Sequence, residues 1–185
     1  MDPATCAQGS EHLNKLLPEH FDANEWFLLI SLCTIVTVAV VLPRRFPTIV
    51  TIVFLAMGLG ISMYVDFLLA PPPLDLYDIN DTKYYELFEI PFYYLYAPFA
   101  YVFVYFYDKW KVRGLWTVLY VAVWSTASTL FERFADYCHV FKYKGWNLGY
   151  SFVFYLAVQS LYLLLYYMVK SSYNRTKRED GPEWN

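Results

Sequence analysis

The sequence has little charge for its length. Only 17% of its 185 residues are Asp, Glu, Lys or Arg, whereas an ordinary soluble domain carries about 25%. With 14 basic and 17 acidic residues the formal net charge is −3, so the chain lacks the basic excess that binds nucleic acid. The mean hydropathy of +0.29 argues against disorder and against a water-soluble globule. This composition indicates an integral membrane protein with no nucleic-acid partner.

Cysteine is scarce too, and three residues are too few for a disulfide scaffold. The predicted topology puts Cys6 and Cys138 on the same side of the membrane, so a bridge is geometrically permitted although nothing requires it. The motifs of zinc peptidases, serine hydrolases, P-loop NTPases and dinucleotide-binding enzymes are absent. His12, His20 and His139 lack metal-ligand spacing. We therefore expect no metal, no cofactor and no catalytic residue, and a protein that is not an enzyme is favoured.

Hydrophobic residues make up 58% of the chain and gather into five long segments. A helix that crosses the ~30 Å hydrocarbon core needs about 20 mostly apolar residues. We expect an all-α integral membrane protein with five transmembrane helices in one bundle, between a polar segment at 1–25 and a charged tail at 170–185. The expected spans are residues 26–43, 46–70, 87–107, 115–137 and 150–169.

Local signals mark the ends of these spans. Asp22 and Glu25 have the spacing of a capping box, which begins a helix. The three prolines at 71–73 end the second span, because proline has no backbone N–H to donate. A polar acidic loop is expected at 74–85, and a connector of 13 to 18 residues before the last span.

Two spans have an unusual composition. The second carries small residues at Ala56, Gly58, Gly60 and Ser62, a face suited to close helix approach. The third has 11 Phe or Tyr between residues 88 and 107. Such rings at helical spacing favour core packing over the alternative, a flat hydrophobic ligand site.

The basic residues set the expected orientation. Five spans place the two termini on opposite sides, and the positive-inside bias puts the more basic side in the cytoplasm. We therefore expect a cell-membrane protein with its N-terminus outside and its C-terminus cytoplasmic. The five outer basic residues would be Lys15, Lys83, Arg133, Lys142 and Lys144. The nine inner ones would be Arg44, Arg45, Lys109, Lys111, Arg113, Lys170, Arg175, Lys177 and Arg178.

Polar residues gather near the expected outer face. On the fourth span, a stripe at three- and four-residue spacing comprises Ser125, Ser128 or Thr129, Glu132 and Asp136. A stripe that faced lipid would be costly, so it should face other helices or a wet cleft. Both a ligand or ion site and a structural hydrogen-bond network remain open.

Four further polar residues have simpler expected roles. Glu89 precedes Pro91 at a helix start, where the helix dipole favours an acid. Asp66 is expected at the point where the second span reaches water. Arg133 is expected to pair with Glu89, Asp66 or a lipid phosphate. Gln159, near the middle of the last span, is expected to hydrogen-bond a neighbouring helix.

The C-terminal part of the chain resembles a family of small multi-pass membrane proteins from endospore-forming Firmicutes of the Bacillus and Clostridium type. The resemblance is carried by Glu132, Tyr143, the run Trp146-Asn147-Leu148-Gly149-Tyr150-Ser151-Phe152 and the Tyr166-Tyr167 pair. It is strongest over residues 132–167 and implies a multi-pass membrane protein. It also points to Glu132, Trp146 and Asn147 as positions to test.

Three functions remain open from the sequence. The favoured one is a non-enzymatic protein of the envelope or of sporulation that works through the lipid bilayer and other membrane proteins. The alternative is a carrier for a small solute, ion or lipid with an outward polar cleft around Glu132. A membrane-embedded enzyme acting on lipids is less favoured. The candidate ligand-binding residues are Glu132, Asp136, Ser128, Trp146, Asn147, Arg133 and Glu89.

Overall fold

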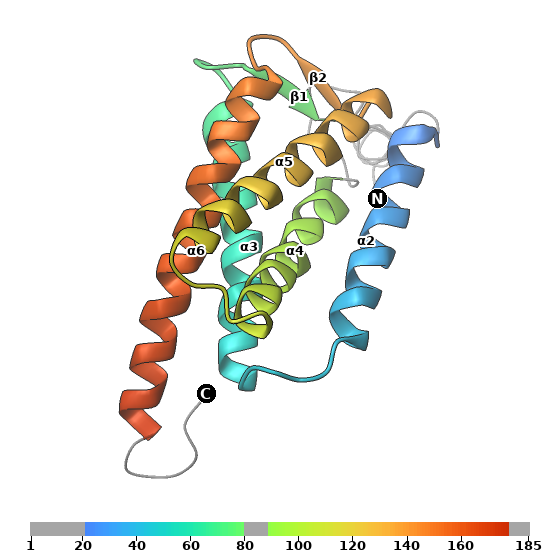
Figure 1. Cartoon of the computed structure of the whole chain (residues 1–185). Helices are drawn as coiled ribbons and strands as arrows, with labels where there is room; N and C mark the ends of the chain where they lie inside the picture. Colours follow the sequence, from blue (N-terminus) through green and yellow to red (C-terminus); the bar gives the residue numbers. More distant parts are fainter. Residues whose placement is uncertain (1–20, 80–88, 178–185) are drawn as a thin grey trace, which may run out of the picture.

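Five antiparallel helices make up most of the computed structural model, which describes residues 21–79 and 89–177. Successive helices run in opposite directions, so the start of the first and the end of the last lie at opposite ends of the bundle (Figure 1). The helices are α2 (Ala23–Val41), α3 (Thr48–Leu69), α4 (Glu89–Lys109), α5 (Leu115–Tyr137) and α6 (Leu148–Lys177). The expected fold class is therefore correct in its coarse form, an all-helical protein.

Two short strands pair at one end of the bundle, which we call the ribbon end. Strand β1 (Tyr77–Ile79) is antiparallel to β2 (Phe141–Tyr143), with Tyr77 opposite Tyr143. The backbone carbonyl of Leu76 also accepts hydrogen bonds from the N–H groups of residues 144–146. The expected acidic loop and connector each contain one of these strands, which the sequence did not reveal, because three-residue strands give no alternating pattern and their partners lie more than 60 residues apart.

Helix bounds differ from the expected spans mainly at the last helix, which continues to Lys177 instead of ending near residue 169. The Asp22 backbone N–H donates to Glu25 Oε2 at 2.7 Å, which confirms the predicted capping box at the start of α2. Cys6 lies outside the described residues, so its bridge to Cys138 stays a prediction.

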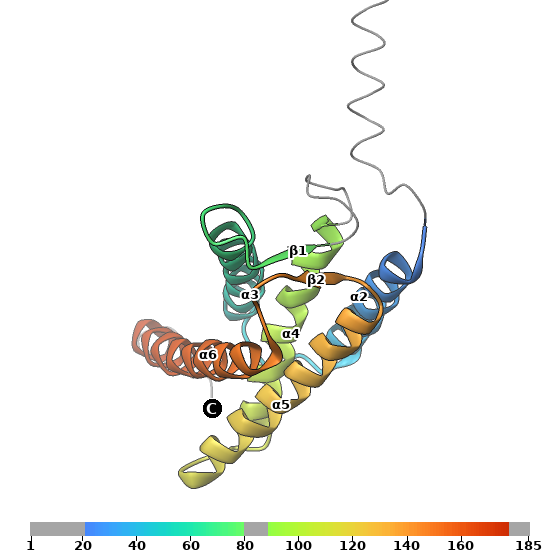
Figure 2. The same cartoon turned by 90° about the horizontal axis from the view of Figure 1, so that it is seen from above.

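Helix α4 lies in the middle of the bundle, surrounded by the other helices (Figure 2). Helices α2 and α3 pack directly on it, while α5 packs mainly on α6. Most of its aromatic side chains are buried, among them Tyr101, Phe103 and Tyr107. The expected burial is confirmed for most of these rings, because α4 lies between the other helices, whereas Tyr94 is 54% exposed.

The close contact between α3 and α4 depends on a glycine. A Cβ atom at Gly58 would lie 2.6 Å from the backbone oxygen of Tyr96 and 2.8 Å from Cα of Ala97. Gly60, one half-turn away, has no atom within 4 Å of the same position. The small-residue face is thus confirmed at Gly58, whereas Gly60 and Ala56 are exposed.

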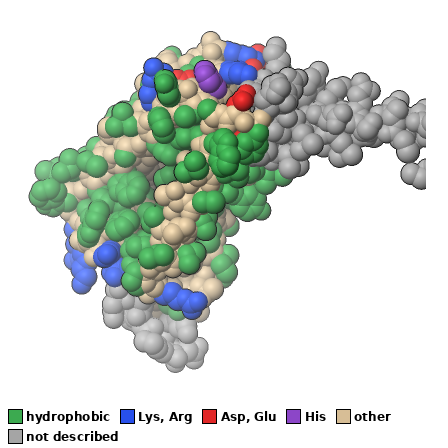
Figure 3. Space-filling model, turned by 90° about the vertical axis from the view of Figure 1, so that its right-hand side faces the viewer, with side chains coloured by type: hydrophobic (Ala, Val, Ile, Leu, Met, Phe, Trp, Pro, Cys, Tyr) green, Lys and Arg blue, Asp and Glu red, His purple; other side chains and the backbone are tan. Residues whose placement is uncertain are grey.

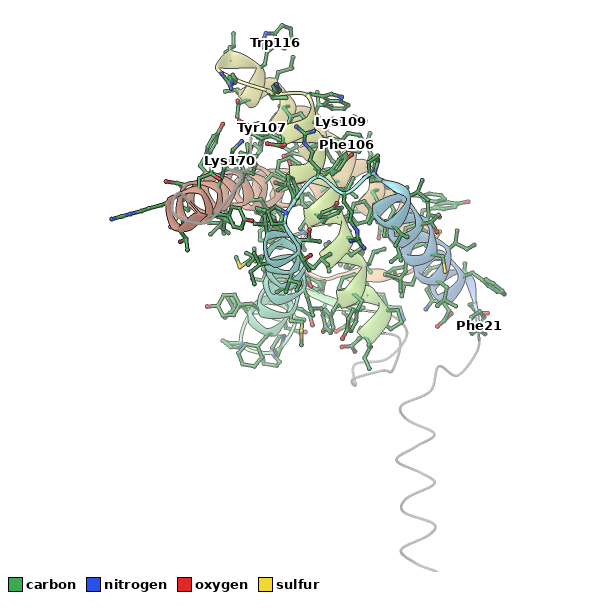
Figure 4. The ribbon with its side chains drawn as sticks, turned by 90° about the horizontal axis from the view of Figure 1, so that it is seen from below. Phe21, Phe106, Tyr107, Lys109, Trp116 and Lys170 are labelled. Atoms are coloured by element: carbon green, nitrogen blue, oxygen red, sulfur yellow. The ribbon has the colours of Figure 1, made fainter. Side chains whose placement is uncertain are left out.

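The opposite end, which we call the turn end, is held by a buried carboxylate. Asp108 at the end of α4 forms an ion pair with Arg45 and accepts a hydrogen bond from the Tyr166 hydroxyl. Lys170 Nζ lies 3.6 Å from Asp108 Oδ1. Figure 4 labels Lys170 and Lys109 at this end, and Trp116 projecting away from the bundle. One acid therefore ties the α2–α3 turn, α4 and α6 together.

Three helices are long and apolar enough to cross a membrane by length and composition: α2, α3 and α6. Their outer faces carry exposed apolar side chains such as Val40, Ile52 and Leu164. On the face in Figure 3, hydrophobic side chains cover the middle of the molecule and charged ones lie toward its two ends. This distribution matches that of a membrane protein.

Substitution of Gly58 by Ala should lower the free energy of unfolding by about 1–3 kcal/mol, because the new methyl group pushes α3 away from the α4 backbone. Gly60→Ala is the matched control and should be neutral or slightly stabilising, since Ala favours a helix. Denaturation of the purified variants in detergent measures both. Equal effects at the two positions would contradict the contact.

Candidate functional site

A cavity of about 300 Å³ lies between α3, α4, α5 and α6. The ribbon contributes Tyr77, Phe141 and Tyr143 to its lining, and the connector contributes Trp146. Most of the other lining side chains are aromatic or aliphatic. Two carboxylates, Asp66 and Glu132, are the ionisable acids in the wall. The cavity is therefore an apolar space with two carboxyl groups in its wall.

Glu132 is buried and bonded from two other elements. Its Oε1 accepts a hydrogen bond from the Tyr143 hydroxyl at 2.6 Å and another from the Ser151 hydroxyl at 2.5 Å. Burial and the Glu132 carboxylate raise the pKa of Tyr143, so this hydroxyl keeps the proton that it donates. These bonds join α5 to β2 and α6, and both use the same carboxylate oxygen.

The start of α6 places Trp146 and Ser151 beside Glu132. Asn147 Oδ1 accepts hydrogen bonds from the backbone N–H groups of Gly149 and Tyr150, so Asn147 caps the helix. This cap puts Ser151 in the first turn, where its hydroxyl accepts a bond from Trp146 Nε1 at 2.8 Å. A Trp–Ser–Glu chain of hydrogen bonds results.

Asp66 approaches the cavity from α3. The Tyr93 hydroxyl donates to its Oδ2, and the same hydroxyl lies 3.2 Å from Oε2 of Glu89. A hydroxyl has one proton, so it serves one carboxylate at a time. The other oxygen, Oδ1, is buried and has no hydrogen-bond partner among the described residues. Asp66, a wall residue, therefore has one oxygen without a hydrogen bond, although the Tyr77 hydroxyl interacts electrostatically with its carboxyl group.

Amide and hydroxyl groups lie further from the ribbon. Ser125 Oγ donates to Gln159 Oε1 at 2.9 Å, and Gln159 Nε2 donates to Ser128 Oγ at 3.2 Å. The predicted bond from Gln159 to a neighbouring helix is confirmed. Ser128 and Gln159 both line the cavity, so its walls carry polar groups at two depths.

Of the seven candidate residues, Glu132, Ser128 and Trp146 line one cavity. Asp136 and the exposed Arg133 do not line it, because they form an ion pair with each other on the surface of α5. The expected pairing of Arg133 with Glu89 or Asp66 was therefore wrong. A partner at i+3 on the same helix is closer than an acid on another helix.

The other two candidates also lie outside the wall. Asn147 uses its side-chain oxygen to cap α6, and Glu89 contacts the Tyr93 hydroxyl without lining the cavity. In turn, Asp66, expected where the second span reaches water, belongs to the wall. Sequence reasoning also missed Tyr77, Tyr96 and Tyr155 as wall residues. For Asp66 the sequence did hold a signal, an acid within an apolar helix. For the tyrosines it held none, because residue spacing along one helix does not show which side chains of four helices become neighbours.

No Lys, Arg or His belongs to the cavity wall within the described part of the chain. Across residues 21–79 and 89–177 there is also no group of three His, Cys, Asp or Glu side chains that could hold a metal ion. Among the described residues, the two wall carboxylates therefore have neither a basic side chain nor a group of metal ligands beside them.

Tyr143→Phe should lower the free energy of unfolding by about 1–2 kcal/mol, because it removes a donor from the buried Glu132 carboxylate. Tyr137→Phe is the control: this tyrosine ends α5 and is 77% exposed, so the change should stay within about 0.5 kcal/mol. Thermal denaturation in detergent compares them. Equal stability of the two variants would show that the Tyr143–Glu132 bond contributes little.

Comparison of the chain with protein-family models, with curated proteins and with solved structures finds no match. The geometry of this cavity therefore carries the evidence for function. Its main elements are an apolar wall, the Glu132 carboxylate held by Tyr143 and Ser151, and the free oxygen of Asp66.

Proposed function

We propose that the protein crosses the membrane five times and binds a small, mostly apolar ligand in the cavity between α3 and α6. The single observation that carries this proposal is the cavity itself, with its apolar wall and a few converging polar groups. Ligand sites in proteins have this character and volumes from about 300 Å³ upward.

The lengths and directions of the helices support five crossings. The shortest, α2, has 19 residues, which span about 28 Å at ~1.5 Å per residue. Helices α4 and α5 lie antiparallel beside the three apolar ones and have 21 and 23 residues. The tyrosines of α4 lower its hydropathy, yet Tyr93, Tyr101, Tyr105 and Tyr107 are buried within the bundle. Helix α5 exposes Val118, Val123 and Leu130, which suit contact with lipid.

The proposed orientation follows from charge. The turn end carries Arg44, Lys111 and Arg113 on its connections, and the positive-inside bias assigns such loops to the cytoplasm. The ribbon end, with the wall carboxylates, would then face the outside of the cell membrane. The resemblance of residues 132–167 to the Firmicutes membrane family is part of the same proposal and accords with a multi-pass protein.

Ligand binding accounts for more of the structure than action through partner proteins alone. A purely structural network needs hydrogen bonds but no open space, and natural cores rarely leave a void larger than a water molecule. Here the carboxylates of Asp66 and Glu132 are arranged around such a space. Helices α3 and α6, which both line it, each pack chiefly on another helix, and an apolar ligand could enter between them from the bilayer.

Two probes of matched shape test this function: uncharged neopentylbenzene and its quaternary isostere benzyltrimethylammonium. Saturation-transfer NMR with the protein in phosphatidylcholine nanodiscs, against empty nanodiscs, should show binding of at least one probe. Val158→Trp fills the cavity from α6 and should weaken that binding at least tenfold.

Val153→Trp is the matched control, because Val153 lies on the same helix, is 64% exposed and does not line the cavity. It should bind the probes as the native protein does. Native binding by Val158→Trp, or no binding of either probe above empty nanodiscs, would overturn the proposed function.

A further inference from the structure

We infer that the ligand of this cavity is a hydrophobic organic cation, an amine or quaternary ammonium whose charge lies against Asp66 and Glu132 and whose apolar body fills the aromatic wall. This inference rests on the proposed ligand-binding function and specifies its ligand class. It concerns the charge of the ligand, whereas the function above concerns occupation of the cavity.

Uncompensated negative charge in the wall is the first argument. Asp66 and Glu132 both line the cavity, and no described Lys, Arg or His lines it with them. None of the described ion pairs involves either carboxylate. Both carboxylates act electrostatically on the Tyr77 and Tyr96 hydroxyls, so their fields overlap within the same space. A cation placed there would be attracted by both.

A free acceptor position is the second argument. Asp66 Oδ1 is buried without a hydrogen-bond donor among the described residues. Glu132 already has hydroxyl partners in Tyr143, Ser151 and Tyr155, so the unpartnered acceptor of the wall is the one at Asp66. A buried polar atom without a partner costs roughly 1–3 kcal/mol. A protonated amine could donate a hydrogen bond to Asp66 Oδ1, whereas a quaternary ammonium ion, which has no N–H, would act on both carboxylates through its charge alone.

The aromatic wall is the third argument, because it suits a cation with an organic body. Rings of Tyr, Trp and Phe attract an ammonium group over their faces, and several such rings form the cages that bind quaternary ammonium ligands. Tyr77, Tyr96, Tyr155 and Trp146 line the cavity together with the two acids. Tyr155 interacts electrostatically with Glu132 and with Tyr96, so ring and carboxylate belong to one cluster.

Other ligand classes fit less well. An inorganic cation such as Ca²⁺ needs six to eight oxygen ligands, and the mostly apolar wall supplies few. An anion would be repelled by both carboxylates, with no basic side chain in the described wall to offset the repulsion. An uncharged apolar ligand would leave the two carboxylates in a desolvated space without a counter-charge, which is costly.

The ratio of affinities for the two isosteric probes tests the inference directly. Benzyltrimethylammonium and neopentylbenzene differ in one atom, nitrogen for carbon, and hence in one positive charge. Native protein in phosphatidylcholine nanodiscs should bind the cation at least tenfold more tightly, after correction for partition into empty nanodiscs. Asp66→Asn and Glu132→Gln should each lower this ratio at least threefold.

Asp136→Asn is the charge-matched control. It removes the same negative charge from α5, one turn beyond Glu132, but Asp136 pairs with Arg133 and does not line the cavity, so the ratio should stay native. If Glu132→Gln fails to fold, Asp66→Asn still tests the role of a wall carboxylate. The ratio of affinities in the native protein is measured without any variant.

Failure of the two proposals can be told apart. Equal affinity for both probes in the native protein, with both lost in Val158→Trp, would overturn the cationic ligand and leave the binding function standing. An unchanged ratio in both carboxylate variants would also overturn it. Binding that is unaffected by Val158→Trp would overturn the binding function.

Discussion

The double hydrogen bond to the Glu132 carboxylate is the interaction on which the ribbon end depends. Inside an apolar bundle a carboxylate needs partners from the protein, because lipid and apolar side chains supply no donors. Tyr143 from β2 and Ser151 from α6 supply them. The ribbon in turn is tied to the α3–α4 connection by Lys144, which pairs with Asp75 and Asp78. Glu132 on α5 thus helps to hold the two strands, which contribute Tyr77, Phe141 and Tyr143 to the lining of the cavity.

The acidic side chains at the two ends of the bundle have different partners. At the turn end, Asp108 has Arg45, Lys170 and the Tyr166 hydroxyl around it, which is a complete set of partners for a structural role. At the ribbon end, Asp66 and Glu132 have hydroxyl donors but no described basic partner, and one oxygen of Asp66 has no partner. This contrast within one molecule is the main reason to assign structure to the first cluster and binding to the second.

The sequence predicts the helices well, because long apolar runs, the Asp22–Glu25 capping box and the proline-rich ends are local signals. It also identifies Glu132, Ser128 and Trp146. It could not identify Asp66 as their neighbour, since the two acids meet only through the packing of α3 and α5 around α4. The pairing of Tyr77 with Tyr143 is equally nonlocal. Asp136 follows Glu132 at helical spacing, yet it pairs at the surface with Arg133.

Central to the account is that every helix crosses the bilayer, so that the ribbon end and the turn end face opposite compartments. Single-cysteine labelling measures this most directly, in a variant whose native cysteines are replaced. Asp75→Cys and Lys142→Cys should react with a membrane-impermeant maleimide on intact cells, because both lie exposed at the ribbon end. Arg44→Cys and Arg113→Cys, exposed at the turn end, should react only after permeabilisation. Labelling of positions 113 and 142 from the same side would show that α5 does not cross and would contradict the account.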